Sequence, residues 1–320
     1  MSMFETFEDA AEVEALAERM RDEDPSVRSI AVLELGDTSD PEAIPLLLTA
    51  LEDDATPVRL QAAKALEAFD GPDVAVGLAG ALTDADTAVS EAAATSLTEL
   101  KDPEAAPALV PFAANESPFV RAAVFRGMKE LRNPVSLSAA LPAIEDPEAA
   151  VRVQAVGVIG YLKTDDALPA LIAGTRDSAA DVRRAAVGAL AYSKSAGASE
   201  AVIKGLDDPE WQVREIAAET MGKMGMTDGV EKLMAAMDDD YWQVRVQAAR
   251  SLGKLKAVRA IPIIAPALEH SISNLRKDAA AALGEIAHPD GLPFLERAAD
   301  DIDPDVRKNV RWAIGRIQAA

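Results

Sequence analysis

The sequence contains no cysteine, only two histidines and few aromatic residues. The lack of cysteine excludes disulfides, thiol nucleophiles and thiolate metal sites in this chain. Aromatic residues make up 4% of the sequence and hydrophobic residues 49%, so a core has to be built from Ala, Leu, Val and Ile, a mixture that favours helices. No apolar run is long enough to span a membrane, and the first ten residues lack the basic and apolar regions of a secretion signal. We therefore expect a cytoplasmic protein without redox chemistry of its own.

Basic residues are scarce as well. The chain has 32 basic and 54 acidic residues, and this net charge of −22 opposes nucleic-acid phosphates and anionic lipids over most of the molecule. We therefore expect neither nucleic acid nor a membrane as the partner. The charge is unevenly spread, because residues 1–110 hold 6 basic and 25 acidic residues, whereas residues 251–320 hold 10 and 9.

Motifs for catalysis or metal binding are also missing. Neither His270 nor His288 is followed by Glu, so the His-Glu pairs of helical-repeat iron hydroxylases are absent. The spacing of Asp301 and Asp303 imitates the start of a calcium loop, but Val306 stands where that loop needs Gly. No phosphate-binding glycine loop or nucleophile elbow is present. We expect no cofactor, no metal site and no enzymatic activity.

What the sequence does contain is a repeat of 31 residues. A Val-Arg pair, or a close variant, recurs at this interval without an insertion or deletion, and such a fixed period is the signature of a stacked array. Small or aliphatic residues four and eight positions later extend the pair into the apolar stripe of one helix, helix B. An aliphatic row eleven positions before the pair predicts another helix, helix A, often with proline in its first turn. The anchors are Val27, Val58, Val89, Val120, Val151, Val182, Val213, Val244, Leu275 and Val306.

Each repeat is thus predicted to be a helical hairpin. Glycine often stands nine positions past the anchor, where helix B should crowd its neighbour or end. A single hairpin cannot bury its apolar face, so neighbouring hairpins must stack. We predict an all-α fold, an α-solenoid (superhelix) of ten stacked hairpins that forms one domain over residues 8–320 after a tail at residues 1–7. Three Asp-Pro pairs are predicted to cap helix B: Asp24-Pro25, Asp208-Pro209 and Asp303-Pro304.

Arginine directly follows the anchor in nine of the ten repeats, and Asp precedes that position by six residues in eight of them. A guanidinium and a carboxylate at fixed offsets can form a hydrogen-bonded ladder between repeats. Ser90 interrupts the arginines, and Asn115 and His270 replace two of the aspartates. Because Ser90 and Asn115 fall in successive repeats, we predict that each Arg reaches the Asp of the following repeat. The alternative, an anion-binding row of arginines, is disfavoured because the carboxylates recur in step.

The two motifs, (D/N)-x4-V-R-x2-A-x3-L-G in helix B and A-(I/L)-P-x-L in helix A, resemble the short HEAT-like repeats named for phycobilisome lyases. The resemblance covers essentially the whole chain, and the acidic, lysine-poor composition is similar to that of proteins from halophilic archaea. Such repeats occur in scaffolds, adaptors, lyase-type chaperones and a few enzymes. We expect a non-catalytic scaffold or adaptor, including a signalling adaptor, that binds a protein. The alternative is a lyase-like maturation factor that presents a cofactor to a client protein.

Positions two, six and ten past the anchor face away from the core and are predicted to line a concave groove. In the fifth and sixth repeats they place two glycines between Tyr161 and Tyr192, with Arg184 nearby, which predicts a recess for a peptide or helix. The alternative is that these glycines ease curvature and the tyrosines cover them.

Further along, the same row predicts a mildly basic groove. Its basic and aromatic residues are Lys223, Arg250, Lys254, Lys277, Lys308, Trp312 and Arg316, and its acidic residues are Glu215, Glu219 and Glu285. This groove is suited to an acidic segment of another protein, or to the acidic amino-terminal arm of a second copy. The alternative is a solvated face of mixed charge.

Two adjacent repeats share a Trp-Gln-Val-Arg motif, which begins at Trp211 and Trp242, and Tyr241 lies beside the second Trp. Exposed aromatic residues of this kind are typical binding hot spots. A Trp in the first turn of helix B also commonly packs over the turn between helices, so a structural role is the alternative.

Overall fold

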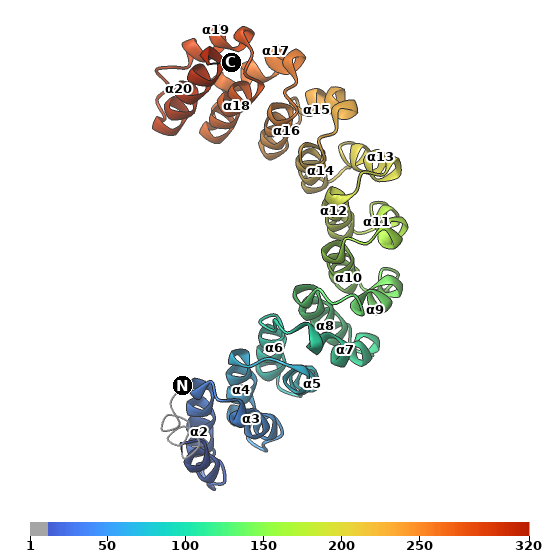
Figure 1. Cartoon of the computed structure of the whole chain (residues 1–320), viewed down its shortest axis with the longest axis vertical. Coiled ribbons are helices and arrows are strands. Elements are labelled where there is room, and N and C mark those ends of the chain that lie inside the picture. Colours follow the sequence, from blue (N-terminus) through green and yellow to red (C-terminus); the bar gives the residue numbers. More distant parts are fainter. Residues whose placement is uncertain (1–11, 320) are drawn as a thin grey trace. The chain divides into compact units, whose positions relative to one another are not determined.

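The computed structural model describes residues 12–319, and these residues form helices joined by short turns, without a strand. The chain divides into two compact units, residues 1–162 and residues 163–320, which are described separately below. Within each unit the even-numbered helices lie side by side along one edge and the odd-numbered helices along the other (Figure 1). These stacked hairpins confirm the predicted α-solenoid. The predicted tail at residues 1–7 lies outside the described residues.

In the first unit, residues 12–19 are helical and form the first repeat together with the helix B that follows them. Four complete hairpins come after this repeat. Short 3-10 segments lead into or extend several of the helices. The α-helices are α2 (Pro25–Thr38), α3 (Ile44–Ala50), α4 (Thr56–Ala65), α5 (Pro72–Ala81), α6 (Thr87–Ser96), α7 (Ala106–Leu109), α8 (Pro118–Leu131), α9 (Ser136–Ala143) and α10 (Ala149–Leu162). The 3-10 segments are η1 (Pro41–Ala43), η2 (Leu66–Ala68), η3 (Pro103–Ala105) and η4 (Val110–Ala114).

The second unit contains five hairpins of the same kind. Its α-helices are α11 (Leu168–Gly174), α12 (Ala180–Ala189), α13 (Ala196–Gly205), α14 (Trp211–Met224), α15 (Val230–Ala236), α16 (Trp242–Lys254), α17 (Ile261–Ile264), α18 (Ser273–Ile286), α19 (Leu292–Arg297) and α20 (Pro304–Gln318). Its 3-10 segments are η5 (Asp165–Ala167), η6 (Leu190–Tyr192), η7 (Thr227–Gly229), η8 (Val258–Ala260), η9 (Ala265–Glu269) and η10 (Pro289–Gly291).

Helix starts follow the capping residues in two of the three predicted places. Asp24 caps α2 by accepting a hydrogen bond from the Ser26 amide, and Asp303 caps α20 by accepting from the amides that follow it. The prediction is wrong for Asp208, because α14 begins two residues after Pro209 and its N-cap is Glu210. Asp208 instead accepts from a ladder arginine of the previous repeat and from the Glu210 amide, which holds it in the turn.

The core of each unit is a double row of small and branched aliphatic side chains. The anchor positions are fully buried from Val58 onward, and so is the helix A row from Leu47 to Leu295. Because every repeat contributes the same two positions, each hairpin buries its apolar face against the next one. The 31-residue period is therefore the spacing of the core itself.

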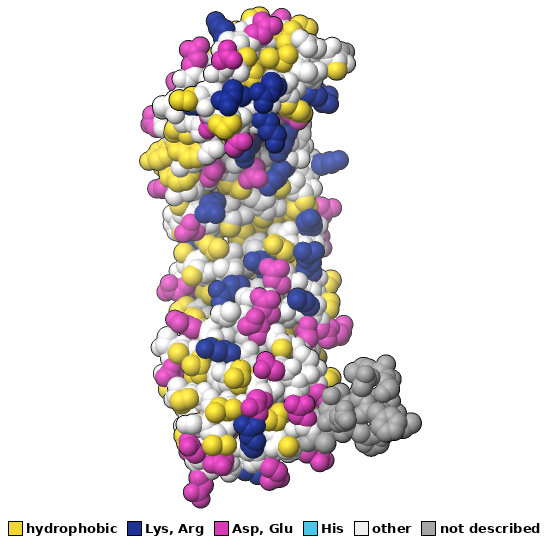
Figure 2. Space-filling model, turned by 90° about the vertical axis from the view of Figure 1, so that its left-hand side faces the viewer, with side chains coloured by type: hydrophobic (Ala, Val, Ile, Leu, Met, Phe, Trp, Pro, Cys, Tyr) yellow, Lys and Arg dark blue, Asp and Glu magenta, His cyan; other side chains and the backbone are white. Residues whose placement is uncertain are grey.

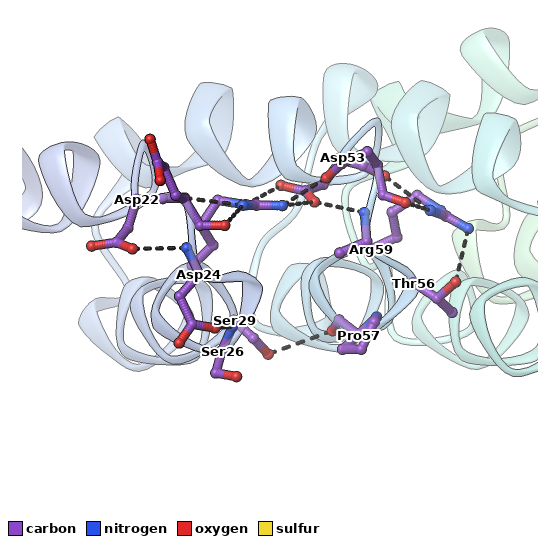
Figure 3. A network of polar contacts seen from close by, with 12 residues as sticks. Asp22, Asp24, Ser26, Ser29, Asp53, Thr56, Pro57 and Arg59 are labelled. Carbon is purple, nitrogen blue, oxygen red and sulfur yellow. Dashed lines mark hydrogen bonds and ion pairs between the residues drawn. The ribbon is translucent and has the colours of Figure 1, made fainter.

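Within each unit, ladder arginines reach the aspartate of the following repeat, as predicted, except that Arg245 meets His270 in place of Asp. The Arg28 guanidinium donates to both carboxylate oxygens of Asp53 at 2.7 Å, and Arg59 donates to Asp84 at 2.6 and 3.1 Å. The same guanidinium also donates to its own turn, since Arg59 Nη1 lies 2.9 Å from the Asp53 carbonyl oxygen (Figure 3). One arginine thus ties two consecutive turns together. Further pairs are Arg121 with Asp146, Arg183 with Asp208, Arg214 with Asp239, and Arg276 with Asp301.

A carboxylate in this position is held in its charged form. The hydrogen bonds from Arg59 lower the pKa of Asp84 below its ordinary value, against the opposing effect of burial. Ser90, where the arginine is missing, bonds only locally, with its hydroxyl donating to the Thr87 carbonyl. The ladder is therefore a structural device of the turns, and it leaves the inner side of the helices free for other contacts.

Candidate partner-binding face

Within each unit, the even-numbered helices carry positions two, six and ten past each anchor, and we call the side that these positions form the inner face. Their residues are exposed or half-buried, except for the buried Val246. The residues predicted to bind a partner are found in both units. Some of these residues pack against other residues of the protein, and others line an open cavity.

In the first unit, Tyr161 is exposed near the end of α10 and lies beside two cations. Lys129 Nζ is 5.5 Å and the Arg132 guanidinium carbon 5.4 Å from the centre of its ring. A side chain at Gly157 would meet the stem of Lys129, since a Cβ atom there would lie 3.2 Å from Lys129 Cδ. The glycine in the predicted recess is thus covered by Lys129.

Tyr192 and Arg184 belong to the second unit. The Tyr192 hydroxyl donates a hydrogen bond of 2.9 Å to the Thr164 carbonyl, and burial of this ring raises the pKa of Tyr192. Arg184 is exposed on α12. Gly188 is covered from the neighbouring helix, because a Cβ atom there would lie 3.3 Å from Ile216 Cγ1. Tyr192 is therefore fixed by its own repeat, and the glycine beside it accommodates a side chain of α14.

Trp211 is engaged by an aromatic residue of the next repeat. The Tyr241 ring stacks on the Trp211 indole with a centroid distance of 5.3 Å and an interplanar angle of 12°. Arg214 adds a cation at 5.8 Å from the Tyr241 ring centre. This stack covers much of Trp211 and leaves Tyr241 exposed at the turn, so the arrangement is the one expected of aromatic residues that stabilise a turn.

Trp242 occupies the equivalent position one repeat later but has different neighbours. It lines a cavity of about 310 Å³ between α14, α16 and α18, together with Arg250 and Lys277. Arg250 is fixed there by Asp278, which accepts two hydrogen bonds from its guanidinium at 2.8 and 3.0 Å. The other residues that line the cavity are Glu215, Gln243, Val246, Gln247 and Asn274.

Glu215 is the glutamate that lines this cavity. Burial raises the pKa of Glu215, while the charges of Arg184 and Arg250 oppose the shift. The cavity combines an indole, a fixed guanidinium and a lysine on one open surface.

The inner face continues from the cavity onto α18 and α20. Trp312 is 42% exposed, and its indole lies over Gly284, where a Cβ atom would be 2.5 Å from the indole Cζ3. The Arg316 guanidinium lies 6.0 Å from the ring centre. Lys254 is exposed at the end of α16. Lysine and arginine side chains gather over this part of the face, near the top of the view in Figure 2.

The structure therefore brings together some of the predicted residues and not others. Trp242 and Arg250 share one cavity, whereas Trp211 and Tyr241 pack against each other. Lys277 belongs to the predicted basic groove, whereas Asp278 is not among the predicted residues. The sequence does contain a signal for Asp278. It stands three positions past its anchor, next to Lys277, where its carboxylate can reach Arg250 at position six of the previous repeat.

The stacked helical hairpins place the chain in the class of α-solenoid repeat proteins. A family profile described as HEAT repeats matches residues 13–88, 74–146, 137–222, 199–281 and 263–320. The chain therefore belongs to the HEAT-repeat family. Among curated proteins no sequence matches it.

Several solved structures share this fold at low sequence identity. An engineered protein has a TM-score of 0.50 with 18% identity, over 96% of this chain and 99% of its own. Kap95p, in a structure of its binding to RanGDP, has a TM-score of 0.64 with 15% identity, and the Kap95:Nup1 complex has 0.66 with 15% identity. The chain spans 52% of each Kap95 chain, while 97% of this chain is covered. Solenoids of this kind are typically non-catalytic protein-binding scaffolds.

Two further findings concern residues 12–319. No helix in this range is long and apolar enough to cross a bilayer. The same residues contain no group of three or more His, Cys, Asp or Glu side chains arranged to hold a metal ion.

Proposed function

We propose that this chain is a non-catalytic scaffold that binds a segment of a partner protein on the inner face of its second unit. The cavity between α14, α16 and α18 carries the proposal, because Trp242 and Arg250 line it from the same helix. Trp and Arg are the residue types most often found at binding hot spots. An anchored guanidinium also loses little conformational freedom when a partner binds.

The first unit offers a less suitable surface. A cavity of about 360 Å³ lies between α2 and α4, but it is lined by Leu33, Gln61, one lysine, two carboxylates and small residues, without an aromatic side chain. The similarity to Kap95p, whose structures contain RanGDP or Nup1, supports a protein partner for a solenoid of this fold. The identity of those partners belongs to Kap95p.

The test uses the two equivalent tryptophans as variant and control. The full chain is used to purify a partner from its source cells, and the affinity of the identified partner is then measured by titration calorimetry. Trp242→Ala is expected to weaken binding at least about tenfold, because a hot-spot truncation costs roughly 2 kcal/mol. Trp211→Ala removes an indole at the same repeat position and is expected to change the affinity less than about threefold, because its stack on Tyr241 points to a structural role. Equal losses in both variants, or none in Trp242→Ala, would refute the site.

A further inference from the structure

We infer that the partner segment is acidic, an extended stretch of Asp and Glu residues with apolar anchors, which crosses α16, α18 and α20. This inference rests on the proposed function and specifies its ligand. It is drawn from four cations of the inner face, which we call the basic row: Lys254, Lys277, Lys308 and Arg316.

The basic row lacks carboxylate partners within residues 12–319. Elsewhere in the second unit, Lys204 pairs with Glu200 at 2.7 Å and Lys232 with Asp207 at 2.7 Å, whereas the exposed Lys194 and Lys256 form no ion pair with a described carboxylate. In the basic row, Lys277 Nζ contacts the amide oxygen of Asn274 at 3.3 Å, and no ion pair joins the four cations to a described carboxylate. Acidic residues outnumber basic ones 54 to 32 in this chain, so a face that carries four cations without ion pairs is a locally basic surface in an acidic protein.

The acidic residues of this surface are few. At the groove positions of α16, α18 and α20 the acidic residue is Glu285. The neighbouring Asp278 is occupied by Arg250, with its carboxylate accepting both hydrogen bonds. A carboxylate supplied by a partner therefore meets cations that no described residue of the protein already neutralises. Complementary charge of this kind selects partners and accelerates association.

Two tryptophans lie on the first and last helices of the basic row, and their separation determines the spacing of the apolar side chains in the ligand. Trp242 lines the cavity on the α14 side, and Trp312 is exposed on α20. Packed helices lie about 8–10 Å apart, so α16 and α20 are roughly 16–20 Å from each other across α18. Trp312 also lies about 12 Å further along its helix than Trp242, at a rise of about 1.5 Å per residue, which gives a separation of roughly 20–23 Å. An extended chain rises about 3.3 Å per residue, so this span corresponds to roughly six or seven residues. The segment is thus a short acidic run with an apolar side chain at each end.

A nucleic acid would also present anionic groups, but it fits this surface less well. Duplex DNA carries a charge about every 1.7 Å of its length, and it would extend beyond the row onto acidic neighbours. On the α14 side those neighbours are Glu215 and Glu219. The protein as a whole has a net charge of −22, which repels a long polyanion while a short segment stays within the row.

The experiment measures binding of a fluorescent peptide with the core Leu-Glu-Asp-Glu-Asp-Glu-Leu to the full chain by anisotropy. A peptide with Lys in place of the acidic residues and an oligothymidine of equal length serve as comparison probes. The double variant K277E/K308E is expected to weaken binding of the acidic peptide at least about tenfold, and added salt should weaken it for the wild type. K277R/K308R keeps the charge and is expected to retain binding.

The matched control is K101E/K194E, which changes the net charge equally at two exposed lysines outside the inner face. An equal loss in this control, an unchanged affinity in K277E/K308E, or tighter binding of the oligothymidine would overturn the inference. Self-association through Lys277 and Lys308 without peptide binding, measured by sedimentation, would also overturn it.

The two experiments test the proposed function and the acidic segment independently of each other. If the purified partner depends on Trp242 but binds K277E/K308E normally, the acidic segment is wrong and the scaffold function stands. If the acidic peptide binds the basic row while no partner depends on Trp242, the row does bind acidic segments, but the proposed binding site of the scaffold is wrong.

Discussion

A single substitution in the ladder changes the chemistry of one turn. His270 stands where the other repeats have Asp, and its Nε2 lies 3.2 Å from Arg245 Nη2, while its Nδ1 accepts from the Ile272 amide at 3.1 Å. A neutral imidazole carries one proton, so it cannot accept both hydrogen bonds in one tautomer. Arg245 Nε is buried, without a hydrogen-bond partner in the part of the chain that the structure describes. The ladder is therefore incompletely hydrogen-bonded at Arg245 and His270.

We expect His270→Asp to stabilise the second unit by about 1 kcal/mol, because it restores a charge-assisted pair that is still partly open to solvent. Burial, followed by the charges of Arg245 and Arg276, lowers the pKa of His270 from its ordinary 6.5. Since the folded-state pKa is lowered, the wild type loses stability as the pH falls below about 6.5, and the variant should not lose this part. The measurement is the urea midpoint by circular dichroism at pH 7.5 and pH 5.5.

His270→Asn is the matched control for this prediction. Asn115 shows that an amide oxygen can accept from the turn, since its side chain bonds the Ser117 amide at 2.9 Å. The control therefore keeps the turn acceptor and lacks the charge. A midpoint of His270→Asp no higher than that of His270→Asn would show that the ion pair adds nothing.

At the scale of elements, the period of the sequence predicted which helices pack together. The anchor row and the helix A row predicted the core, and the successive losses at Ser90 and Asn115 predicted that the ladder joins neighbouring repeats. These features could be predicted because every repeat faces nearly the same neighbours. A residue whose role depends on one repeat alone is not determined by the period.

The two tryptophans show this limit. Trp211 and Trp242 have the same position and motif, but the residue that lies 30 positions after each differs. It is Tyr241 for Trp211, and the two rings stack. It is Ile272 for Trp242, whose indole instead lines the cavity with Arg250. The cavity depends on this local difference, and no motif in the sequence marks it.

Consecutive B helices lie in close contact at some glycines and not at others. This difference predicts that a Gly→Ala substitution has opposite effects on stability at two equivalent positions. At Gly284 a Cβ atom would lie 2.8 Å from the Ala313 Cα atom as well as 2.5 Å from Trp312, so the α18–α20 packing would have to shift. We expect Gly284→Ala to destabilise the protein by about 1–3 kcal/mol, as overpacking does.

Gly315 has the same repeat position in α20 and is the matched control. No heavy atom lies within 4 Å of a Cβ atom there, and the residue is exposed on a helix. Gly315→Ala should therefore stabilise the protein by roughly 0.5–1 kcal/mol through its helix propensity. Urea unfolding of both variants provides the measurement. Effects of the same sign would show that contact with the next helix does not determine this position.

At the scale of the whole molecule, the two units differ in charge far more than in fold. Residues 1–162 contain 11 basic and 30 acidic residues, and residues 163–320 contain 21 and 24. The first unit thus has a net charge of −19 and the second of −3. Mutual repulsion among carboxylates destabilises a compact state, and salt screens it.

This difference predicts that potassium chloride stabilises the two units unequally. The Debye length falls from about 10 Å at 0.1 M salt to about 3 Å at 1 M, which screens most of the repulsion between surface carboxylates. Stability in a repeat array is largely local, so the gain should appear where the charge is. We expect slower amide hydrogen exchange at 1 M than at 0.1 M potassium chloride in α2 to α8, and a smaller change in α14 to α20. Sodium sulfate is unsuitable as the test salt, because it strengthens burial of apolar surface throughout a protein. A flat response to potassium chloride, or an equal gain in both units, would show that carboxylate repulsion does not limit the stability of this protein.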